Sequence, residues 1–349
     1  MTIAGAGLMG RWHARYAAKA GARIAAIVDP DLAAGHALAR RFPGAAVCAT
    51  LEESFRGPSD AVHVCGPPAT HEASVRAALE AGRHVLVEKP LAPAADAARR
   101  LLELAKRRGR ILSAVHQFPF QRGARELARK RERLGMIVRL DFLLCSAGGT
   151  GLSPEDARES LLATLSHPVS LFRLCLAKTP NVSEWTVAHT AAGDVALSAA
   201  CGEASLGVFL THRGRPTRCR LDVLGSRASA HLDLFHGFSV VERRRVSRLS
   251  KAAAPLRSGA GILGTAAANL AWRAAHREPA FPGLPALVRA FYGAIQGGGV
   301  SPVSSDEILD AALLVDRVRR EAEKSERESE SESESATDLT GKRGPDPSF

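Results

Sequence analysis

The stretch that decides the fold opens the chain: MTIAGAGLMG, residues 1–10. Its apolar start predicts a short buried strand, and its glycines follow the pattern G-x-G-x-x-G. In this pattern the first glycine permits a tight turn, the second lets the backbone approach a pyrophosphate, and the third lets the next helix lie close to the strand. Ordinary strand–helix turns also contain glycines, so the surroundings must decide. The candidate cofactor-binding residues here are Gly5, Gly7, Leu8, Met9 and Gly10.

An acidic residue supports the nucleotide interpretation of these glycines. Asp29 ends the next predicted strand, 19 residues after Gly10. A carboxylate at that spacing accepts hydrogen bonds from ribose hydroxyls, while the helix N-terminus attracts phosphate. The Asp29 carboxylate would repel a 2′-phosphate, and the following Pro30 and Asp31 include no Arg that could bind one. The sequence therefore predicts a dinucleotide site that favours NAD over NADP.

Hydrophobic periodicity predicts the fold class. Up to residue 118, five short apolar runs alternate with Ala-rich amphipathic stretches, which is typical of a doubly wound parallel sheet, a Rossmann domain. Strand-like runs with short links follow and predict a second, α+β domain over 119–323 with an open, mostly antiparallel sheet. We therefore expect an α/β protein with two domains that meet near residues 117–122.

The end of the chain divides into a helix and a tail. Residues 306–323 carry apolar side chains at helical spacing after two serines that can cap a helix start, so we expect a closing helix that packs back on the Rossmann domain. Residues 324–349 are charged and of low complexity, and we expect them to be disordered. Helical repetition within 154–176 predicts a further helix interrupted at Pro168.

The Ala/Gly/Leu-rich residues 249–276 form one more distinct segment. Gly259, Gly261 and Gly264 argue against a continuous helix there, so we expect an excursion that packs on the second domain. An amphipathic helix resting on a membrane surface is the alternative.

Composition excludes several protein classes. The formal charge of +11 is carried mainly by Arg spread along the chain, without a basic patch interleaved with aromatic residues, so we expect no nucleic-acid partner. No apolar run approaches the roughly 18 residues of a membrane span, and the start lacks the features of a signal peptide. We expect a cytoplasmic protein.

The six cysteines form no CxxC pair and no zinc-site spacing, which predicts reduced thiols and no metal site.

A second motif identifies a family resemblance. The segment PPATHEASVRAALEAGRHVLVEKPLA, residues 67–92, ends a predicted strand with Glu-Lys-Pro. Together with the glycine motif, VHQFPFQRGARELARKRERLGMIVRL (115–140), SHP (166–168) and PVSSDEILDAALLVDRVR (302–319), it resembles the Gfo/Idh/MocA family of nicotinamide-dependent oxidoreductases. Glucose–fructose oxidoreductase and inositol dehydrogenase are the namesakes of that family. The resemblance spans most of residues 1–323.

The resemblance implies a substrate site between the nicotinamide and the second sheet. It implies that Lys89 points into this site and binds a substrate oxygen, where negative charge builds up as hydride moves. A surface lysine at a strand end is the alternative, and His116 could equally be a structural hinge residue. His71 is as well suited to capping or packing as to ligand contact. The residues placed beside cofactor or substrate are Pro67, Pro68, His71, Glu88, Lys89, His116 and Gln117.

One family pattern is incomplete in this chain. Relatives commonly carry D-x-x-x-H, in which Asp and His lie one helical turn apart and handle a sugar-like diol. The histidine here is His167, but the acid position is Ala163, and a second acidic position is Ser170. The nearby acids Glu155, Asp156 and Glu159 could substitute, although sequence alone does not place them.

These observations leave two main hypotheses. The first is an NAD(P)-dependent oxidoreductase that acts on a small, sugar-like or cyclic substrate, or on a C=C or C=N bond. In it Lys89 polarises the substrate, His167 relays the proton and His116 assists. The second is a catalytically impaired dinucleotide-binding sensor or scaffold protein, suggested by Ala163. A basic membrane- or nucleic-acid-associated protein rests only on the charge and on residues 249–276. As in similar proteins, the open sheet could form a homo-oligomer.

Overall fold

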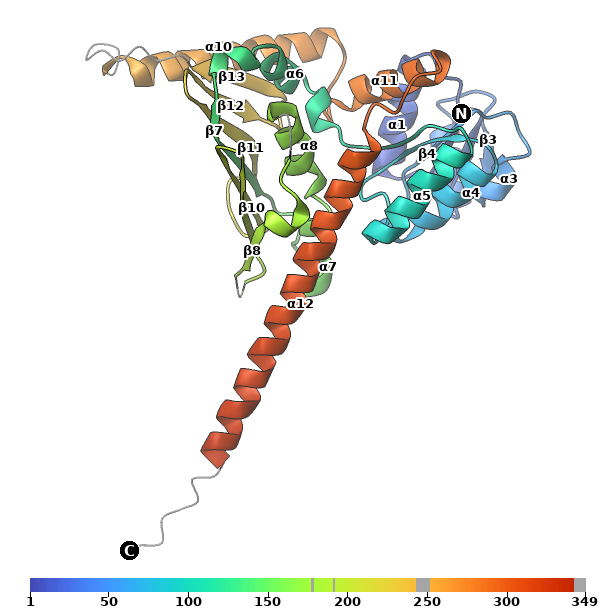
Figure 1. Cartoon of the computed structure of the whole chain (residues 1–349). Coiled ribbons are helices and arrows are strands. Elements are labelled where there is room, and N and C mark those ends of the chain that lie inside the picture. Colours follow the sequence, from blue (N-terminus) through green and yellow to red (C-terminus); the bar gives the residue numbers. More distant parts are fainter. Residues whose placement is uncertain (177–178, 191, 243–251, 342–349) are drawn as a thin grey trace, which may run out of the picture.

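The chain folds around two β-sheets, one in each half of the molecule (Figure 1). The structure, a computed structural model, describes residues 1–176, 179–190, 192–242 and 252–341. The first sheet has six parallel strands, and the second has seven strands that are mostly antiparallel. The predicted fold class, α/β with a Rossmann sheet and a second, open sheet, is therefore confirmed.

The first sheet has the strand order β3-β2-β1-β4-β5-β6. The chain adds β2 and β3 on one side of β1 and then adds β4, β5 and β6 on the other side, so the order of the strands switches between β1 and β4. Ligands of such sheets bind at this switch, beyond the carboxyl ends of the strands. Five strands were expected; β3 was missed because it is a three-residue edge strand with only partly buried side chains. The strands are β1 (Thr2–Ala4), β2 (Ala26–Val28), β3 (Ala46–Cys48), β4 (Ala61–Val64), β5 (His84–Val87) and β6 (Leu112–Ala114).

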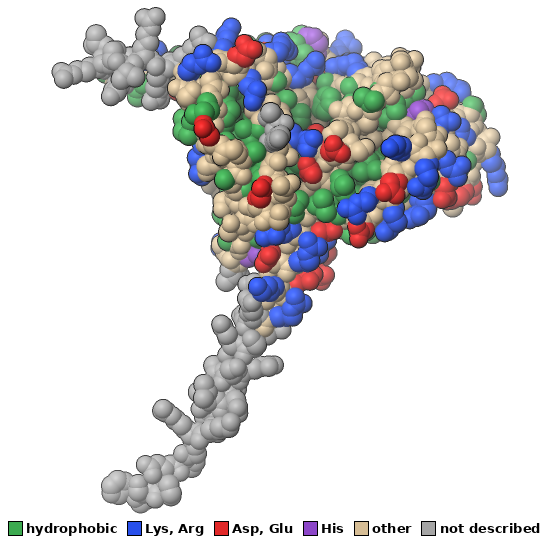
Figure 2. Space-filling model, viewed as in Figure 1, with side chains coloured by type: hydrophobic (Ala, Val, Ile, Leu, Met, Phe, Trp, Pro, Cys, Tyr) green, Lys and Arg blue, Asp and Glu red, His purple; other side chains and the backbone are tan. Residues whose placement is uncertain are grey.

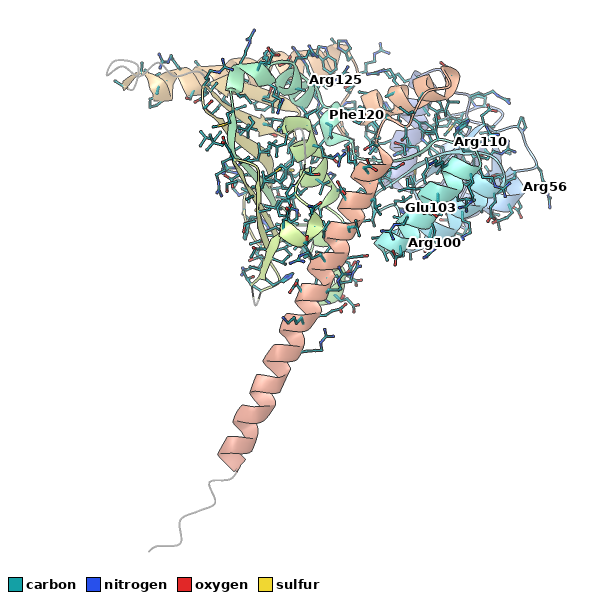
Figure 3. All side chains as sticks on the ribbon, in the orientation of Figure 1. Arg56, Arg100, Glu103, Arg110, Phe120 and Arg125 are labelled. Atoms are coloured by element: carbon teal, nitrogen blue, oxygen red, sulfur yellow. The ribbon has the colours of Figure 1, made fainter. Side chains whose placement is uncertain are left out.

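Helices cover this sheet through small apolar side chains. In α5 the buried face consists of alanines and Leu101, and the polar side chains of Arg100 and Glu103 point away from the sheet (Figure 3). On the face shown in Figure 2, basic side chains are interspersed with acidic ones over this half. The helices are α1 (Leu8–Lys19), α2 (Leu32–Ala39), α3 (Leu51–Ser54), α4 (His71–Glu80) and α5 (Ala95–Arg107).

The second sheet has the order β13-β12-β11-β7-β10-β9-β8, with β7 parallel to β10 and antiparallel to β11. One face carries the second hydrophobic core, and Phe209 and Leu224 remain exposed on the other face. A homo-oligomer through this open face stays a prediction. The strands are β7 (Ile137–Cys145), β8 (Thr186–His189), β9 (Val195–Cys201), β10 (Ala204–Thr211), β11 (Arg218–Gly225), β12 (Ser229–Asp233) and β13 (Phe238–Glu242).

Three helices, α6 (Arg122–Arg129), α7 (Pro154–Leu162) and α8 (Ser166–Cys175), belong to this half. The predicted interruption at Pro168 is wrong, because the helix breaks earlier, at residues 163–165. Pro168 then falls in the first turn of α8, where a backbone N–H has no intrahelical acceptor and its absence costs little. The break separates Ala163 from His167, so the two residues do not share one helix.

The closing helix α12 (Ser305–Gly341) lies between the two halves (Figure 1). Ser304 Oγ accepts the Glu307 N–H at 3.2 Å, as the predicted serine cap requires. Ile308 joins the first core, whereas Leu314 and Val318 join the second. The helix continues to Gly341, whereas disorder was predicted from residue 324 onward. Residues 342–349 lie outside the described part of the chain.

The segment 249–276 packs on the second domain as expected, but it is helical. Helix α10 (Ala254–Ala275) is continuous and packs on β13, although it contains Gly259, Gly261 and Gly264. Leu256, Leu263 and Leu270 are exposed on it. Residues 249–251 are not described. No helix within the described ranges has the length and apolar character needed to cross a membrane.

Helix α11 (Leu284–Gln296) returns to the Rossmann half. Leu284, Leu287 and Phe291 are fully buried in the first core, and α11 packs against α1. Although 119–323 was predicted to belong to the second domain, this helix is physically part of the first.

Candidate active site

The glycine turn leaves an open space at the start of α1. Helix α1 begins after Gly7, and no side chain caps its free N–H groups. A Cβ at Gly7 would meet no atom within 4 Å, whereas a Cβ at Gly10 would lie 1.8 Å from the Gly5 carbonyl oxygen. Gly5 adopts a φ of +106°, which only glycine tolerates readily. Gly10 thus serves strand–helix packing, and Gly7 leaves an anion-sized space before the helix N-terminus.

Asp29 lies beside this turn. Its Oδ2 accepts the Ala6 N–H at 2.7 Å, and its Oδ1 accepts the Asp31 N–H at 2.9 Å. These bonds hold the carboxylate next to the glycine turn while leaving each oxygen a further lone pair for a hydroxyl donor.

The loops after β4 and β5 are joined through His71. Its Nδ1 lies 2.7 Å from the Pro90 carbonyl oxygen, and its Nε2 lies 3.0 Å from that of Gly66. The buried His71 ring thus lies between the two loops, and its contact with a ligand stays a prediction. Pro67 helps to shape the loop after β4, since its carbonyl oxygen accepts the Thr70 N–H at the start of a short 3₁₀ turn.

Glu88 belongs to a buried chain of hydrogen bonds that the sequence did not predict. Glu88 Oε1 lies 3.0 Å from His13 Nε2, His13 Nδ1 lies 3.0 Å from His63 Nδ1, and His63 Nε2 lies 3.0 Å from the Tyr292 hydroxyl. Burial opposes ionisation of Glu88, but the His13 hydrogen bond and Lys89 outweigh it and lower the pKa of the carboxyl. A hydrogen-bonded chain thus runs from the Tyr292 hydroxyl through His63 and His13 to the Glu88 carboxylate.

Lys89 follows Glu88 and lines a cavity of about 550 Å³. Burial lowers the pKa of Lys89 from 10.5, and the neighbouring Glu88 carboxylate opposes this shift. Pro68, His116 and Ala163 line the same cavity. The structure therefore brings together the lysine and one of the two candidate histidines at the carboxyl edge of the parallel sheet.

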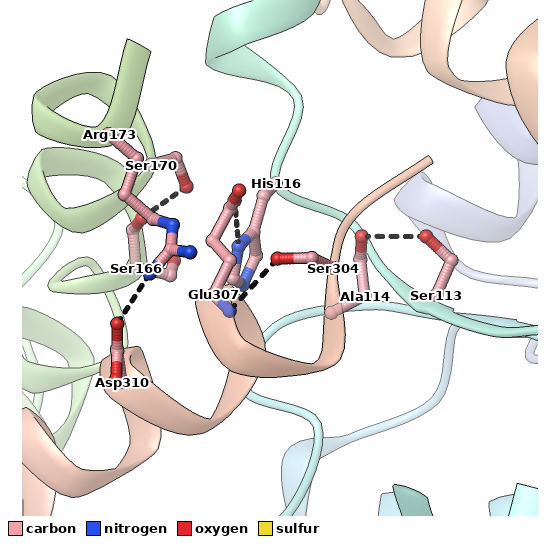
Figure 4. Close-up of polar contacts among 9 residues, drawn as sticks. All are labelled: Ser113, Ala114, His116, Ser166, Ser170, Arg173, Ser304, Glu307 and Asp310. Carbon is pink, nitrogen blue, oxygen red and sulfur yellow. Dashed lines mark hydrogen bonds and ion pairs between the residues drawn. The ribbon is translucent and has the colours of Figure 1, made fainter. Parts of the chain in front are cut away.

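His116 has an acidic partner that comes from the far end of the sequence. Its Nδ1 lies 2.8 Å from Glu307 Oε1, on the first turn of α12 (Figure 4). Burial again opposes ionisation, but the hydrogen bond from His116 and the contact with Ser170 lower the pKa of Glu307. Because Glu307 engages Nδ1, Nε2 is the ring nitrogen left for proton exchange.

His167, the predicted proton relay, is buried. Its ring stacks on Phe118 with centroids 4.0 Å apart, and its Nδ1 is buried without a hydrogen-bond partner. Burial, together with nearby Lys89 and His116, holds the pKa of His167 well below its ordinary value. The ring is therefore held in its neutral form, and a role for His167 in proton transfer stays a prediction. The Gln117 carbonyl oxygen accepts the Phe120 N–H, and its contact with a cofactor also stays a prediction.

No group of three His, Cys, Asp or Glu side chains suited to a metal ion occurs among the described residues. No disulfide joins the cysteines of the described part of the chain, and Cys145, Cys175 and Cys219 are buried. Burial raises the pKa of the Cys175 thiol to about 12, which keeps it protonated and unreactive.

The fold and the glycine turn define an α/β protein with a dinucleotide-binding Rossmann domain. Residues 1–116 match the model of the Gfo/Idh/MocA family, described as an oxidoreductase family with an NAD-binding Rossmann fold. The N-terminal domain therefore matches the family that the sequence resemblance predicted.

Among curated proteins, inositol 2-dehydrogenase of Corynebacterium glutamicum (strain R) is 37% identical over 108 residues, which are 30% of this chain and 32% of that protein. The match thus spans about a third of each. Two solved structures share the fold of the whole chain. A dehydrogenase from Chromobacterium violaceum has a TM-score of 0.74 at 15% identity, covering 95% of this chain and 98% of that one. The WlbA dehydrogenase from Bordetella pertussis, in complex with NADH and UDP-GlcNAcA, has a TM-score of 0.71 at 16% identity, covering 92% and 95%.

The two inner glycines should respond differently to an added methyl group. Gly10→Ala should lower the free energy of unfolding by about 1–3 kcal/mol, because the Cβ collides with backbone. Gly7→Ala should change it by no more than about 1 kcal/mol but should weaken NADH binding about tenfold or more, since its Cβ enters the space before the helix. Urea unfolding and fluorescence titration with NADH measure the two effects. Equal NADH affinity in Gly7→Ala and the parent protein would contradict the assignment.

Proposed function

We propose that this protein is an NAD-dependent oxidoreductase that moves a hydride between nicotinamide and a secondary alcohol, or its ketone, on a small sugar-like or cyclic substrate. The observation that carries the proposal is the meeting of Lys89 and the His116–Glu307 pair in one cavity at the carboxyl edge of the Rossmann sheet. The names of the curated relatives, inositol dehydrogenases, support the substrate type.

The chain's residues fit a dinucleotide. The uncapped start of α1 and the open space at Gly7 would receive the pyrophosphate, and Asp29 would accept hydrogen bonds from the adenosine ribose. Asp29 favours NAD over NADP, because a carboxylate repels a 2′-phosphate and the following Pro30 and Asp31 include no Arg that could bind one. When bound, the nicotinamide supplies the hydride acceptor or donor.

Proton transfer falls to His116 in this proposal. In the oxidative direction its Nε2 accepts the proton of the substrate hydroxyl, and Glu307 stabilises the imidazolium that results. The Lys89 ammonium lies against the same oxygen and stabilises the charge that develops on it. Glu307 thereby supplies a carboxylate that positions 163 and 170 lack, which removes the main reason for the sensor or scaffold hypothesis.

The cofactor preference can be tested at Asp29. Asp29→Ser should weaken NADH binding about tenfold or more and bring the NADH and NADPH affinities close together, because a hydroxyl does not repel a 2′-phosphate. Fluorescence titration with both cofactors measures this. Asp31→Asn is the control, since Asn keeps the cap of α2. No saturable NADH binding by the parent protein at submillimolar concentration would refute the proposed function itself.

The His116–Glu307 pair predicts a specific kinetic defect. Glu307→Gln should lower kcat by about a hundredfold, because an amide stabilises the imidazolium poorly, while the dissociation constant for NADH stays unchanged. The control is Asp306→Asn, which changes the neighbouring exposed carboxylate. Full activity in Glu307→Gln would exclude the acid–base role of the pair.

Deprotonation of Lys89 should determine how the activity falls at alkaline pH. Its protonated form stabilises the substrate oxygen, and burial lowers its pKa from 10.5. Activity should therefore fall as the pH rises through a value below 10.5. In Lys89→Arg the cation persists above that pH, so this limb of the kcat/KM profile should disappear, at a lower overall rate. Lys106→Arg, an exposed control on α5, should keep the original profile.

A further inference from the structure

We propose that the substrate of this site carries a deoxygenated carbon next to its reacting carbon, as in an alicyclic or deoxysugar-like alcohol, and is not a fully hydroxylated ring. The inference rests on the proposed function, whose site it describes in more detail. It follows from how polar and apolar groups are divided over the wall of the cavity.

Besides Lys89 and His116, the polar side chains that line the cavity are Asp156, Glu159, Ser160, Ser166 and Arg319. Lys89 and His116 provide the contacts to the reacting oxygen in the proposed chemistry. Ser166 lines the same cavity, is 6% exposed, and has a buried hydroxyl with no hydrogen-bond partner. A buried polar atom without a partner is rare in a folded protein and indicates a group that a ligand satisfies. Ser166 therefore suits one additional oxygen on the substrate.

The wall beyond these groups is apolar. Ala163 lines this cavity, and its methyl group cannot accept a hydrogen bond. Across the cavity, α12 contributes Ile308, Ala311, Ala312 and Val315, and the loop after β5 contributes Leu91. A substrate hydroxyl placed against this wall would lose its water without gaining a partner, which is unfavourable.

The acidic residues near the mouth do not replace the missing acid. Both carboxylate oxygens of Glu159 are engaged by Arg319, with Nε at 3.1 Å from Oε1 and Nη2 at 2.8 Å from Oε2. Asp156 is exposed and accepts the Ser153 hydroxyl at 2.8 Å. The structure thus brings two of the three sequence candidates to the cavity rim, where their oxygens are already bonded or face solvent. Glu155 does not line the described cavity.

Discrimination by such a wall should be measurable. An apolar pocket discriminates against an added hydroxyl by up to roughly a hundredfold, so a preference of at least tenfold is expected. Two six-membered rings make a matched comparison: trans-1,2-cyclohexanediol has two adjacent hydroxyls, and myo-inositol has one on every carbon.

The test measures NAD reduction with both rings, together with the thermal midpoint of the NADH-saturated protein in the presence of each. The expected result is a kcat/KM at least tenfold higher for the cyclohexanediol and a larger rise in thermal midpoint. Ala163→Asp should shift the ratio toward myo-inositol about tenfold or more, with the NADH dissociation constant unchanged. Ser166→Ala should reduce the preference for the diol over cyclohexanol, because the second oxygen loses its donor.

Controls separate the possible outcomes. Ala157→Asp adds a carboxylate on the same helix at a residue that does not line the described cavity, and it should leave the ratio unchanged. Ala163→Ser is a milder variant if the aspartate prevents folding, and it should shift the ratio in the same direction. Equal or better use of myo-inositol by the parent protein overturns the inference, and so does failure of the cyclohexanediol to bind the NADH complex. Absence of NADH binding overturns the proposed function instead.

Discussion

The hydrogen bond between His116 and Glu307 joins the end of the Rossmann sheet to the first turn of the closing helix, and the cavity depends on it. The same helix places Asp316 Oδ2 2.9 Å from the Ala95 N–H, which caps the otherwise uncapped start of α5. Through these contacts α12 fixes the distance between the two halves. Its apolar side chains then become the wall opposite α7, so one element sets both the proton-transfer geometry and the shape of the substrate space.

Features governed by local rules could be predicted from the sequence. The glycine turn, the acid after β2 and the alternation of strands and helices follow from steric and hydrophobic requirements that act within about 30 residues. Errors arose where a local rule was applied without its context. Gly259 and Gly264 disfavour helix in isolation, yet α10 is continuous against β13. Pro168 breaks a helix interior, but it stands in a first turn where it is tolerated.

Features made by residues far apart in the chain could not be predicted. His116 and Glu307 are 191 positions apart, and the residues around Glu307 read as Ser-x-x-Glu, a pattern that indicates a local capping box. The serine does cap the helix, but the glutamate turns away to the histidine. The chain from Glu88 through His13 to His63 is equally hidden, because its members lie just after β5, on α1 and on β4, and meet only when the sheet forms. Sequence reasoning assigned the proton to His167, with His116 assisting, because the D-x-x-x-H pattern points to His167.

The return of α11 to the first core has a consequence for how the chain matures on the ribosome. The Rossmann sheet is complete once residue 114 has been made, but Leu284, Leu287 and Phe291 cover part of its core. Until they emerge, roughly 170 residues later, the nascent first domain exposes the apolar surface that they will bury. During this interval we expect chaperones to bind the exposed apolar surface of the N-terminal half. Truncated products that end within the second sheet should keep this surface exposed and should therefore aggregate or be degraded.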